Sequence, residues 1–312
     1  MGRHNKTLRE PQLHFICGKG GVGKSTYACA LAKHFTQKKL RTLLVQVNAS
    51  DSHSAILKTT FIDSTLRQAE PLLWVVNVTP KDSLREYLLL KVPSPQLYRL
   101  IFESPLLRSF LKFVPALAEL NMLGKIWYHA QEKNEEETRY QRIVIDCPAT
   151  GHGLRFLSVA KVTYEGIKKG GIAEEALQIA SMIADAKRSA LHIITLPEEM
   201  AVNEALHLMQ EVQNSKVIAL YMLVINGLSK AIFSQASKEI IEQITASKLL
   251  PDFDQLINAA QKRIIQAEAE LAQTARMQAV KGDKQFLQLP RLRGNDEAAV
   301  TEMMLFNLNA FA

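Results

Sequence analysis

The chain has 312 residues, with 38 Lys and Arg against 31 Asp and Glu for a net charge of +7, and 47% of its residues are apolar. Only 14 Gly and 11 Pro are present and no apolar run is long enough to cross a bilayer, which excludes a collagen-like chain and predicts a soluble globular protein with a large core. The polar N-terminus, the three cysteines without a CxxC pair and the dispersed positive charge predict a cytoplasmic protein and argue against specific nucleic-acid binding.

Short β-like runs alternate with helical patterns along the chain. Most of these runs are continuously apolar, as expected for strands that are covered on both faces of a parallel sheet. The predicted strands are 13–17, 42–47, 73–79, 142–146, 191–195, 217–225 and 285–289, and the predicted helices are 24–39, 198–213, 254–280 and 296–308. The alternation predicts an α/β fold, a doubly wound and mostly parallel sheet in a single domain over residues 1–312.

Two longer stretches, 81–141 and 159–188, interrupt this alternation. Both carry helical patterns, and a structureless loop of that length is rare in a compact domain. Four prolines between residues 93 and 115 divide the first stretch into short helices. We therefore expect an inserted helical subdomain with little sheet to cover. Its many apolar residues fit either an ordinary core or a groove for an apolar partner.

The strongest motif is the run Gly18-Lys19-Gly20-Gly21-Val22-Gly23-Lys24-Ser25-Thr26. It follows a predicted strand and opens a predicted helix, which is the context that a phosphate-binding loop requires. Glycines let backbone N–H groups close around phosphate oxygens, and the helix N-terminus adds a favourable dipole. We expect Lys24 to reach the β- and γ-phosphates and the Ser25 hydroxyl to ligate Mg²⁺. The motif therefore predicts that the chain binds ATP with Mg²⁺.

A second motif follows the predicted strand 142–146. This strand resembles the one that carries the Walker B acid of such ATPases, with Asp146 at its C-terminal end. A carboxylate in this position can hold a water molecule of the Mg²⁺ shell. An ordinary buried strand that ends in a turn aspartate would have the same pattern.

The run Asp146–Arg155, DCPATGHGLR, resembles switch II of the ATPases of arsenical pumps and of tail-anchored-protein targeting, the ArsA-like family. The resemblance also includes the phosphate-binding loop, Thr195–Glu199, Asn226 and Leu289–Pro290, so it covers most of the chain. The helical insertions fall where that family places its helical subdomain. Switch II is much more specific than the loop, which alone would indicate only the wider class that includes partition ATPases.

The resemblance implies roles for individual residues. Lys19 matches the second lysine of deviant Walker loops, which reaches the phosphates of the facing subunit, and it implies a homodimer that closes on the nucleotide. Asn226 would hydrogen-bond the adenine, with Pro290 in the loop beside it, although Asn226-Gly227 is also a common turn. His152 would be an element of the switch loop.

The chain departs from the family pattern after its second predicted strand. The family has an aspartate followed by proline there, and this aspartate positions the attacking water. Here Val47 leads directly into Asn48, which takes the place of the aspartate, while Asp51 could substitute if the loop folds differently. An asparagine can orient water but cannot accept its proton. Because phosphoryl transfer depends mostly on positioning and charge, hydrolysis can continue with slow turnover.

Two specialisations of the family are missing. The chain lacks the CxxC that shares a zinc ion across the dimer of eukaryotic targeting factors, as in a bacterial-type member, and no cysteine lies in the helical insertions. The cargo chemistry of the family therefore cannot be transferred.

We predict a cytoplasmic, Mg²⁺-dependent ATPase whose nucleotide-driven homodimer closure moves a helical subdomain that handles an apolar or anionic cargo. One alternative is a partition-type ATPase that binds DNA or membrane, which residues 296–312 disfavour because they contain no Lys or Arg. Another alternative is a nucleotide-binding switch with very slow turnover, which Asn48 suggests.

Overall fold

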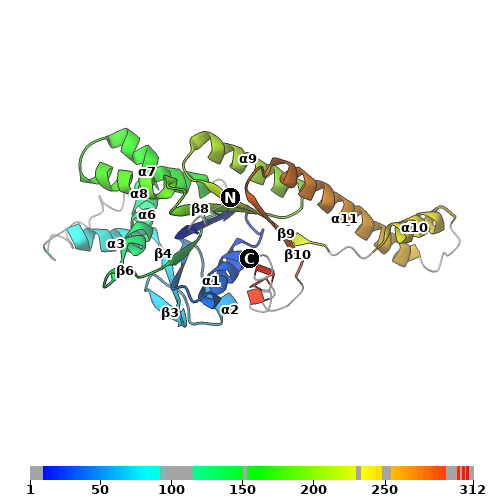
Figure 1. Ribbon diagram of the computed structural model, residues 1–312, viewed down its shortest axis with the longest axis horizontal. Helices are drawn as coiled ribbons and strands as arrows, with labels where there is room; N and C mark the ends of the chain where they lie inside the picture. Colours follow the sequence, from blue (N-terminus) through cyan, green and yellow to red (C-terminus); the bar gives the residue numbers. More distant parts are fainter. Residues whose placement is uncertain are drawn as a thin grey trace, which may run out of the picture.

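The computed structural model describes residues 10–91, 94, 115–149, 153–229, 233–247, 254–292 and six positions between 301 and 308. Its centre is an eight-stranded sheet with the order β10-β9-β8-β1-β7-β2-β4-β3 (Figure 1). The strands are β1 Leu13–Gly18, β2 Thr42–Val47, β3 Arg67–Glu70, β4 Leu73–Val78, β7 Arg142–Asp146, β8 Ser189–Thr195, β9 Leu220–Leu228 and β10 Gln285–Pro290. All neighbouring strands are parallel except the edge pair β3 and β4.

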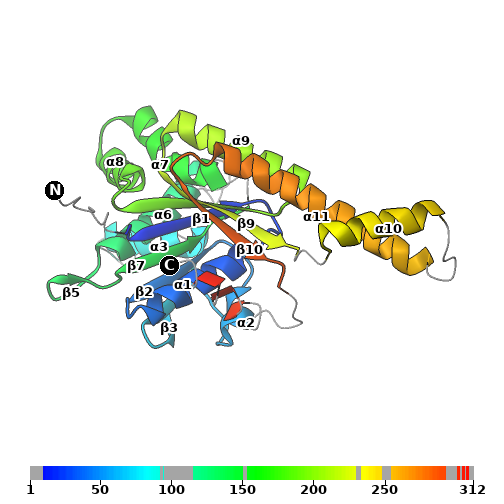
Figure 2. The same cartoon turned by 45° about the vertical axis from the view of Figure 1, so that its right-hand side comes forward.

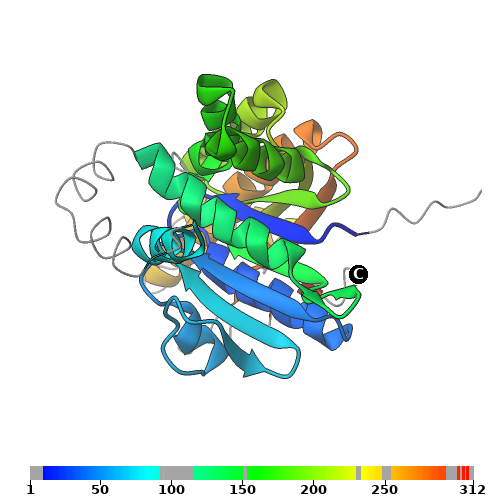
Figure 3. The ribbon, with the colours of Figure 1, turned by 90° about the vertical axis from the view of Figure 1, so that its left-hand side faces the viewer.

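Helices cover both faces of this sheet. Their bounds are α1 Lys24–Gln37, α2 His53–Leu57, α3 Pro80–Lys91, α6 Pro115–Gln131, α7 Gly153–Ile167, α8 Gly171–Ala184, α9 Glu199–Ser215, α10 Gln235–Ser247 and α11 Asp254–Val280. Successive strand residues point to opposite faces, so Phe15 packs in the core under α6 to α9, whereas Ile16 packs in the core under α1. Figure 3 shows α7 and α8 on one side of the sheet and α1 on the other. The arrangement confirms the predicted doubly wound α/β fold.

Most predicted elements lie within a few residues of the observed ones, because strands buried on both faces have an unmistakable apolar pattern. Four short or exposed elements escaped prediction: α2, the edge strand β3, the helix α10 and the small hairpin of β5 (Lys133–Asn134) and β6 (Glu137–Thr138). Helix α2 has only five residues, too few to show a helical period, and the other three carry mostly polar residues, so their apolar pattern is weak. Of the predicted helix 296–308, positions 301, 302, 304, 305, 307 and 308 are helical, and the others lie outside the described residues.

The inserted helices do cover sheet, contrary to our expectation. Leu123 of α6, Phe156 of α7 and Ile183 of α8 are at most 1% exposed, and they share one apolar core with the strands. The reason is that α6 and α8 contact the sheet directly while α7 packs between them. Much of the apolar content of residues 115–188 is therefore ordinary core.

Helices α10 and α11 form an arm that extends away from the sheet (Figures 1 and 2). The base of this arm is anchored to the end of β9, since the backbone N–H and the hydroxyl of Ser229 donate hydrogen bonds to Glu270 of α11 at 2.7 and 2.9 Å. Farther out, Ile240 and Leu256 expose more than half of their surface. The arm therefore carries apolar side chains into solvent.

Candidate functional site

The glycine-rich loop lies at the carboxyl end of β1, between the neighbouring strands β7 and β8. Strands β2 to β4 and β7 lie on one side of β1 in the sheet, and the later strands β8 to β10 lie on its other side. Doubly wound folds bind their ligands at such a point, where the strand order reverses. A Cβ at position 18 would lie 2.2 Å from the carbonyl oxygen of Ile194, and one at position 23 would lie 2.5 Å from Nδ2 of Asn226. Gly23 also has a φ of 91°. Both positions therefore require glycine.

The two lysines of the loop have different surroundings. The ammonium of Lys24 reaches back across the loop and donates a hydrogen bond to the carbonyl oxygen of Lys19 at 3.0 Å. The side chain of Lys19 points instead to α9, where it pairs with Glu204 at 2.9 Å, and both side chains are more than a third exposed. The Lys24 side chain thus crosses its own loop, whereas the Lys19 side chain lies at the exposed edge of that loop.

A buried carboxylate lies beside the loop, at the end of β7. Oδ2 of Asp146 accepts hydrogen bonds from the Ser25 hydroxyl at 2.7 Å and from Nε2 of His53 at 3.0 Å. Oδ1 of the same carboxylate is buried and has no hydrogen-bond partner in the described part of the chain. A hydroxyl and a carboxylate are ligand types that suit Mg²⁺, and the orphaned Oδ1 suits a metal-bound water. Ser25 and Asp146 therefore fit the ion that the sequence implies.

Sequence reasoning did not find His53. It lies at the start of α2 with 1% exposure, and 93 residues separate it from Asp146. No motif surrounds it, and only the three-dimensional fold brings the two residues together.

The two candidates for positioning the attacking water have distinct environments. Asn48 follows β2 directly, is exposed and has a φ of 44°, and its backbone N–H donates to the carbonyl oxygen of Val78 at 2.9 Å. The oxygens of Asp51 accept backbone hydrogen bonds from Ser54 and Ile62, both at 3.0 Å. Burial would raise the pKa of Asp51, but hydrogen bonds from the Ser54 side chain and from the backbone of Ile62 and Ser54 outweigh it and lower the pKa. Asp51 is thus engaged in holding the loop, whereas the Asn48 residue is exposed; the water-positioning role of either residue stays a prediction.

The remaining candidates lie at the same edge of the sheet, with one exception. Asn226 of β9 donates a hydrogen bond from Nδ2 to the carbonyl oxygen of Val22 at 2.9 Å, so its amide braces the loop. Pro290 ends β10 beside Leu228 of β9. His152 lies outside the described residues. The contacts of Asn226 and Pro290 with adenine stay predictions.

A chain of hydrogen bonds between buried side chains connects β1 and β8 with the first turn of α1. The Tyr27 hydroxyl lies 3.0 Å from Nδ1 of His192, whose Nε2 lies 3.0 Å from Nδ1 of His14. Nε2 of His14 lies 3.0 Å from the carbonyl oxygen of Pro11. Because a carbonyl only accepts, both imidazoles carry their proton on Nε2, and Tyr27 donates to His192. One set of neutral tautomers thus satisfies all three bonds.

A cavity, which we name the apolar groove, lies between α3, α6 and α8. Its volume is about 710 Å³, and its lining is dominated by apolar side chains that include Leu84, Leu88, Leu117, Leu120, Trp127 and Ile179. Leu90 is 75% exposed and Tyr128 is 52% exposed at its edge. In the part of the chain that the structure describes, no helix is both long and apolar enough for a membrane span.

Comparisons with known proteins identify a family model and several ATPases to which this chain is similar. A family model described as anion-transporting ATPase matches residues 12–178, just over half of the chain. The ATPase BagA of Mycobacterium tuberculosis is 25% identical over 292 residues, which cover 84% of this chain and 83% of the relative. The chain is also similar to ATPase GET3 of Podospora anserina, at 24% identity over 50% of this chain and 44% of the relative. An ATPase ASNA1 homolog of Plasmodium berghei is 22% identical over 83% of this chain and 75% of the relative.

Proposed function

Since this chain belongs to the ArsA family of anion-transporting ATPases and is an ATP hydrolase, we propose that it uses Mg²⁺-dependent hydrolysis to move helices that hold an apolar segment of another protein. In this proposal residues 1–312 form one domain and the chain acts in the cytoplasm as a homodimer. The moving unit is the helical subdomain at about 81–141 and 159–188, of which the structure describes α3, α6, α7 and α8.

The nucleotide site supplies the chemistry. The backbone N–H groups of residues 18–26 surround the phosphates, and the Lys24 ammonium neutralises their charge. Ser25 and Asp146 hold Mg²⁺, which supplies further positive charge when bound. Asn48 orients the attacking water without accepting its proton, so turnover is slow. The hydrogen bond from Ser25 to Asp146 and the buried Oδ1 of Asp146 support the Mg²⁺ role.

Homodimer closure assigns a role to Lys19. Its ion pair with Glu204 is exposed, and pairs of this kind contribute only about 0–1 kcal/mol. Lys19 therefore leaves Glu204 at little cost when the phosphates of a second copy come within reach. The similarity to the deviant Walker loop supports this exchange.

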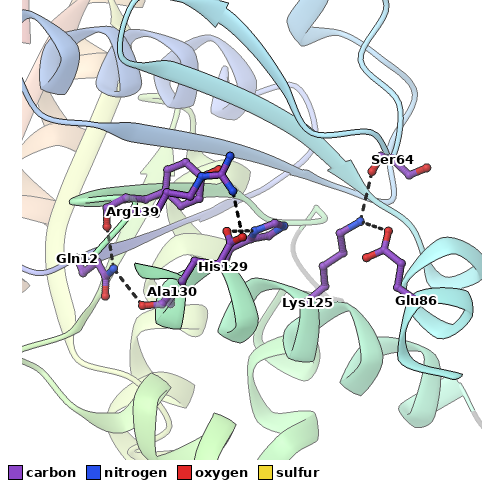
Figure 4. A network of polar contacts seen from close by, with 9 residues as sticks. Gln12, Ser64, Glu86, Lys125, His129, Ala130 and Arg139 are labelled. Carbon is purple, nitrogen blue, oxygen red and sulfur yellow. Dashed lines mark hydrogen bonds and ion pairs between the residues drawn. The ribbon is translucent and has the colours of Figure 1, made fainter. Parts of the chain in front are cut away.

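The proposed coupling between the nucleotide site and the groove rests on the contacts of Lys125, which Figure 4 shows. Lys125 of α6 is almost buried, and its ammonium lies 2.8 Å from a Glu86 carboxylate oxygen on α3 and 3.3 Å from the carbonyl oxygen of Ser64. Ser64 lies in the segment between α2 and β3, which follows Asn48 and His53 along the chain. Lys125 thereby joins two walls of the apolar groove to the segment that leads from Asn48 and His53 to β3.

The lining of the groove indicates the class of cargo. Apolar side chains dominate it, and the charged groups at its edge are engaged with one another, as in the pair of Lys91 and Glu175 at 2.6 Å. Such a lining favours an apolar helix over an anion, because a buried anion requires compensating positive charge. We therefore propose an apolar protein segment as cargo.

The coupling can be tested with the fluorescence of Trp127, which lines the groove. The chain has 2 tryptophans, so the background variant Trp74→Phe makes Trp127 the sole reporter. We expect Mg²⁺ and ATP to change its emission, and an apolar helical peptide to change it further. Lys24→Ala should abolish the ATP response, and Lys125→Met should reduce it without loss of ATP binding. A protein that binds ATP while Trp127 stays silent would contradict the proposal.

A further inference from the structure

His53 is the one protein group that reaches the Asp146 carboxylate from the segment after β2, among the residues that the structure describes. Its side chain is 1% exposed, and its Nε2 lies 3.0 Å from Oδ2 of Asp146. A carboxylate only accepts hydrogen bonds, so Nε2 carries the proton and donates it. The first residue of α2 is therefore attached to the acid at the end of β7.

This hydrogen bond differs in kind from the one that Ser25 donates to the same oxygen at 2.7 Å. When the Ser25 hydroxyl ligates Mg²⁺ through an oxygen lone pair, the same group has two tasks, because its proton is still available to Asp146. The imidazole of His53 has no such second task. It is held in place by burial, and a fixed donor of this kind determines the plane of a carboxylate whose terminal torsion is otherwise broad.

The fixed plane matters because the two carboxylate oxygens have different surroundings. Oδ2 accepts both hydrogen bonds, whereas Oδ1 is buried without a partner in the described structure. A quarter turn of the carboxylate would move both oxygens out of these two positions, whereas a half turn only exchanges two equivalent oxygens. The donor at His53 opposes the quarter turn.

We propose that His53 is a positioning residue for the Mg²⁺ site: its Nε2–H holds Oδ2 of Asp146, so that Oδ1 stays available to a metal-bound water. The inference rests on the proposed function, because it concerns Mg²⁺ bound with ATP. It also binds α2 to the site. Four residues separate His53 from Asn48, so the same hydrogen bond limits the positions that the Asn48 loop adopts.

The segment around His53 is built to transmit this restraint. Asp51 bonds the backbone of Ser54 and Ile62, and Asn77 of β4 donates to the carbonyl oxygen of Ala49 at 2.8 Å. These contacts brace both sides of α2. A displacement at Asp146 is therefore passed to α2 as a unit rather than absorbed by a loose loop.

The test compares His53→Leu, which removes the donor, with His53→Gln, whose amide N–H can still reach Asp146. Binding of a fluorescent ATP analogue, mant-ATP, is measured in EDTA and across a Mg²⁺ titration. We expect His53→Leu to leave the affinity in EDTA within about twofold while the Mg²⁺ concentration for half-maximal tightening rises about 10–100-fold, as for other groups that orient metal ligands. His53→Gln should recover most of that loss. Variant His207→Leu on the exposed face of α9 serves as the matched control and should resemble the wild type.

The outcomes separate the inference from the function on which it rests. If the wild type binds no mant-ATP, or if Mg²⁺ does not tighten binding, the proposed function fails. If the wild type responds to Mg²⁺ and His53→Leu responds at the same concentration, His53 has no positioning role and the inference is overturned. Should His53→Leu fail to fold, His53→Asn replaces it, because its shorter amide cannot reach Asp146. Equal Mg²⁺ dependence of the Asn and Gln variants would then overturn the inference.

Discussion

Acidification from pH 7.5 to pH 5 should destabilise the chain through the two buried histidines that connect β1 with β8. Burial lowers the pKa of His192 to about 3. Burial, and then the charges of His192 and Arg142, lowers the pKa of His14 well below its ordinary value. A second proton on either ring would break the single tautomer pattern that joins Tyr27 to the carbonyl oxygen of Pro11. The folded state therefore keeps both imidazoles neutral.

The size of the effect follows from linkage. In the unfolded chain each histidine binds a proton near pH 6.5, so the unfolded state takes up more protons than the folded state below that pH. The free energy of unfolding is thus unaffected above about pH 6.5 and falls progressively toward pH 3. At pH 5 the loss is about 2 kcal/mol for His192, and His14 adds a loss of the same sign. That is a large fraction of the 5–15 kcal/mol typical of a folded domain.

Urea unfolding at the two pH values measures this loss. The comparison is with the triple variant His14→Leu, Tyr27→Phe and His192→Leu, which replaces all three hydrogen-bonded side chains at once and so avoids an orphaned hydroxyl. The wild type should lose at least about 2 kcal/mol more than the variant between pH 7.5 and pH 5. His207→Gln, which changes a histidine that is 71% exposed, should retain the wild-type dependence. Parallel losses in the wild type and the triple variant would refute the reasoning.

Three further predictions concern the nucleotide site. Asn48→Asp should raise the rate of phosphate release by restoring a carboxylate beside the γ-phosphate, whereas Asp51→Asn should change it little; the reverse pattern in a steady-state assay would assign the water to Asp51. Lys19→Ala should weaken ATP-driven dimerisation while the monomer stays folded, as measured by light scattering. An ATP-dependent dimer of the variant that is as stable as that of the wild type would exclude a contact of Lys19 with the facing subunit. Gly23→Ala should lower ATP affinity and cost about 1 kcal/mol or more of stability, because the new Cβ meets Asn226 at 2.5 Å with a φ of 91°. Truncation of that neighbour by Asn226→Ala should recover part of the stability, as measured by thermal unfolding; an additive loss would argue against the clash.

The sequence was most informative where the functional residues are adjacent along the chain. The phosphate-binding loop is contiguous, and its strand and helix carry strong apolar patterns, so the fold class and the family were predicted and are confirmed. The roles of Lys19, Lys24, Asn48 and Asp146 stay predictions. His53 and Lys125 were not found, because their partners Asp146 and Ser64 lie 93 and 61 residues away and only the fold brings them together.

The sheet coverage of the insertion was also predicted wrongly. An apolar helix pattern shows that one face is buried, but it does not show against what. In α6 the same helix buries Leu123 against the sheet core and presents Trp127 to the groove. The distinction between core and groove therefore depends on tertiary packing.

The strand order has a consequence for the folding of the chain during its synthesis on the ribosome. The apolar strand β1 emerges first, yet its neighbours in the sheet are β7 and β8, which are synthesised much later. At about 5–20 residues per second, β1 waits about 10–35 s before β8 has been made. Both edges of β1 are open to pairing with other chains until β7 has emerged, and one edge stays open until β8 follows, so a nascent chain needs protection until residue 195 has emerged. A fragment that stops short of β8 leaves this strand permanently unpartnered on one side and should aggregate.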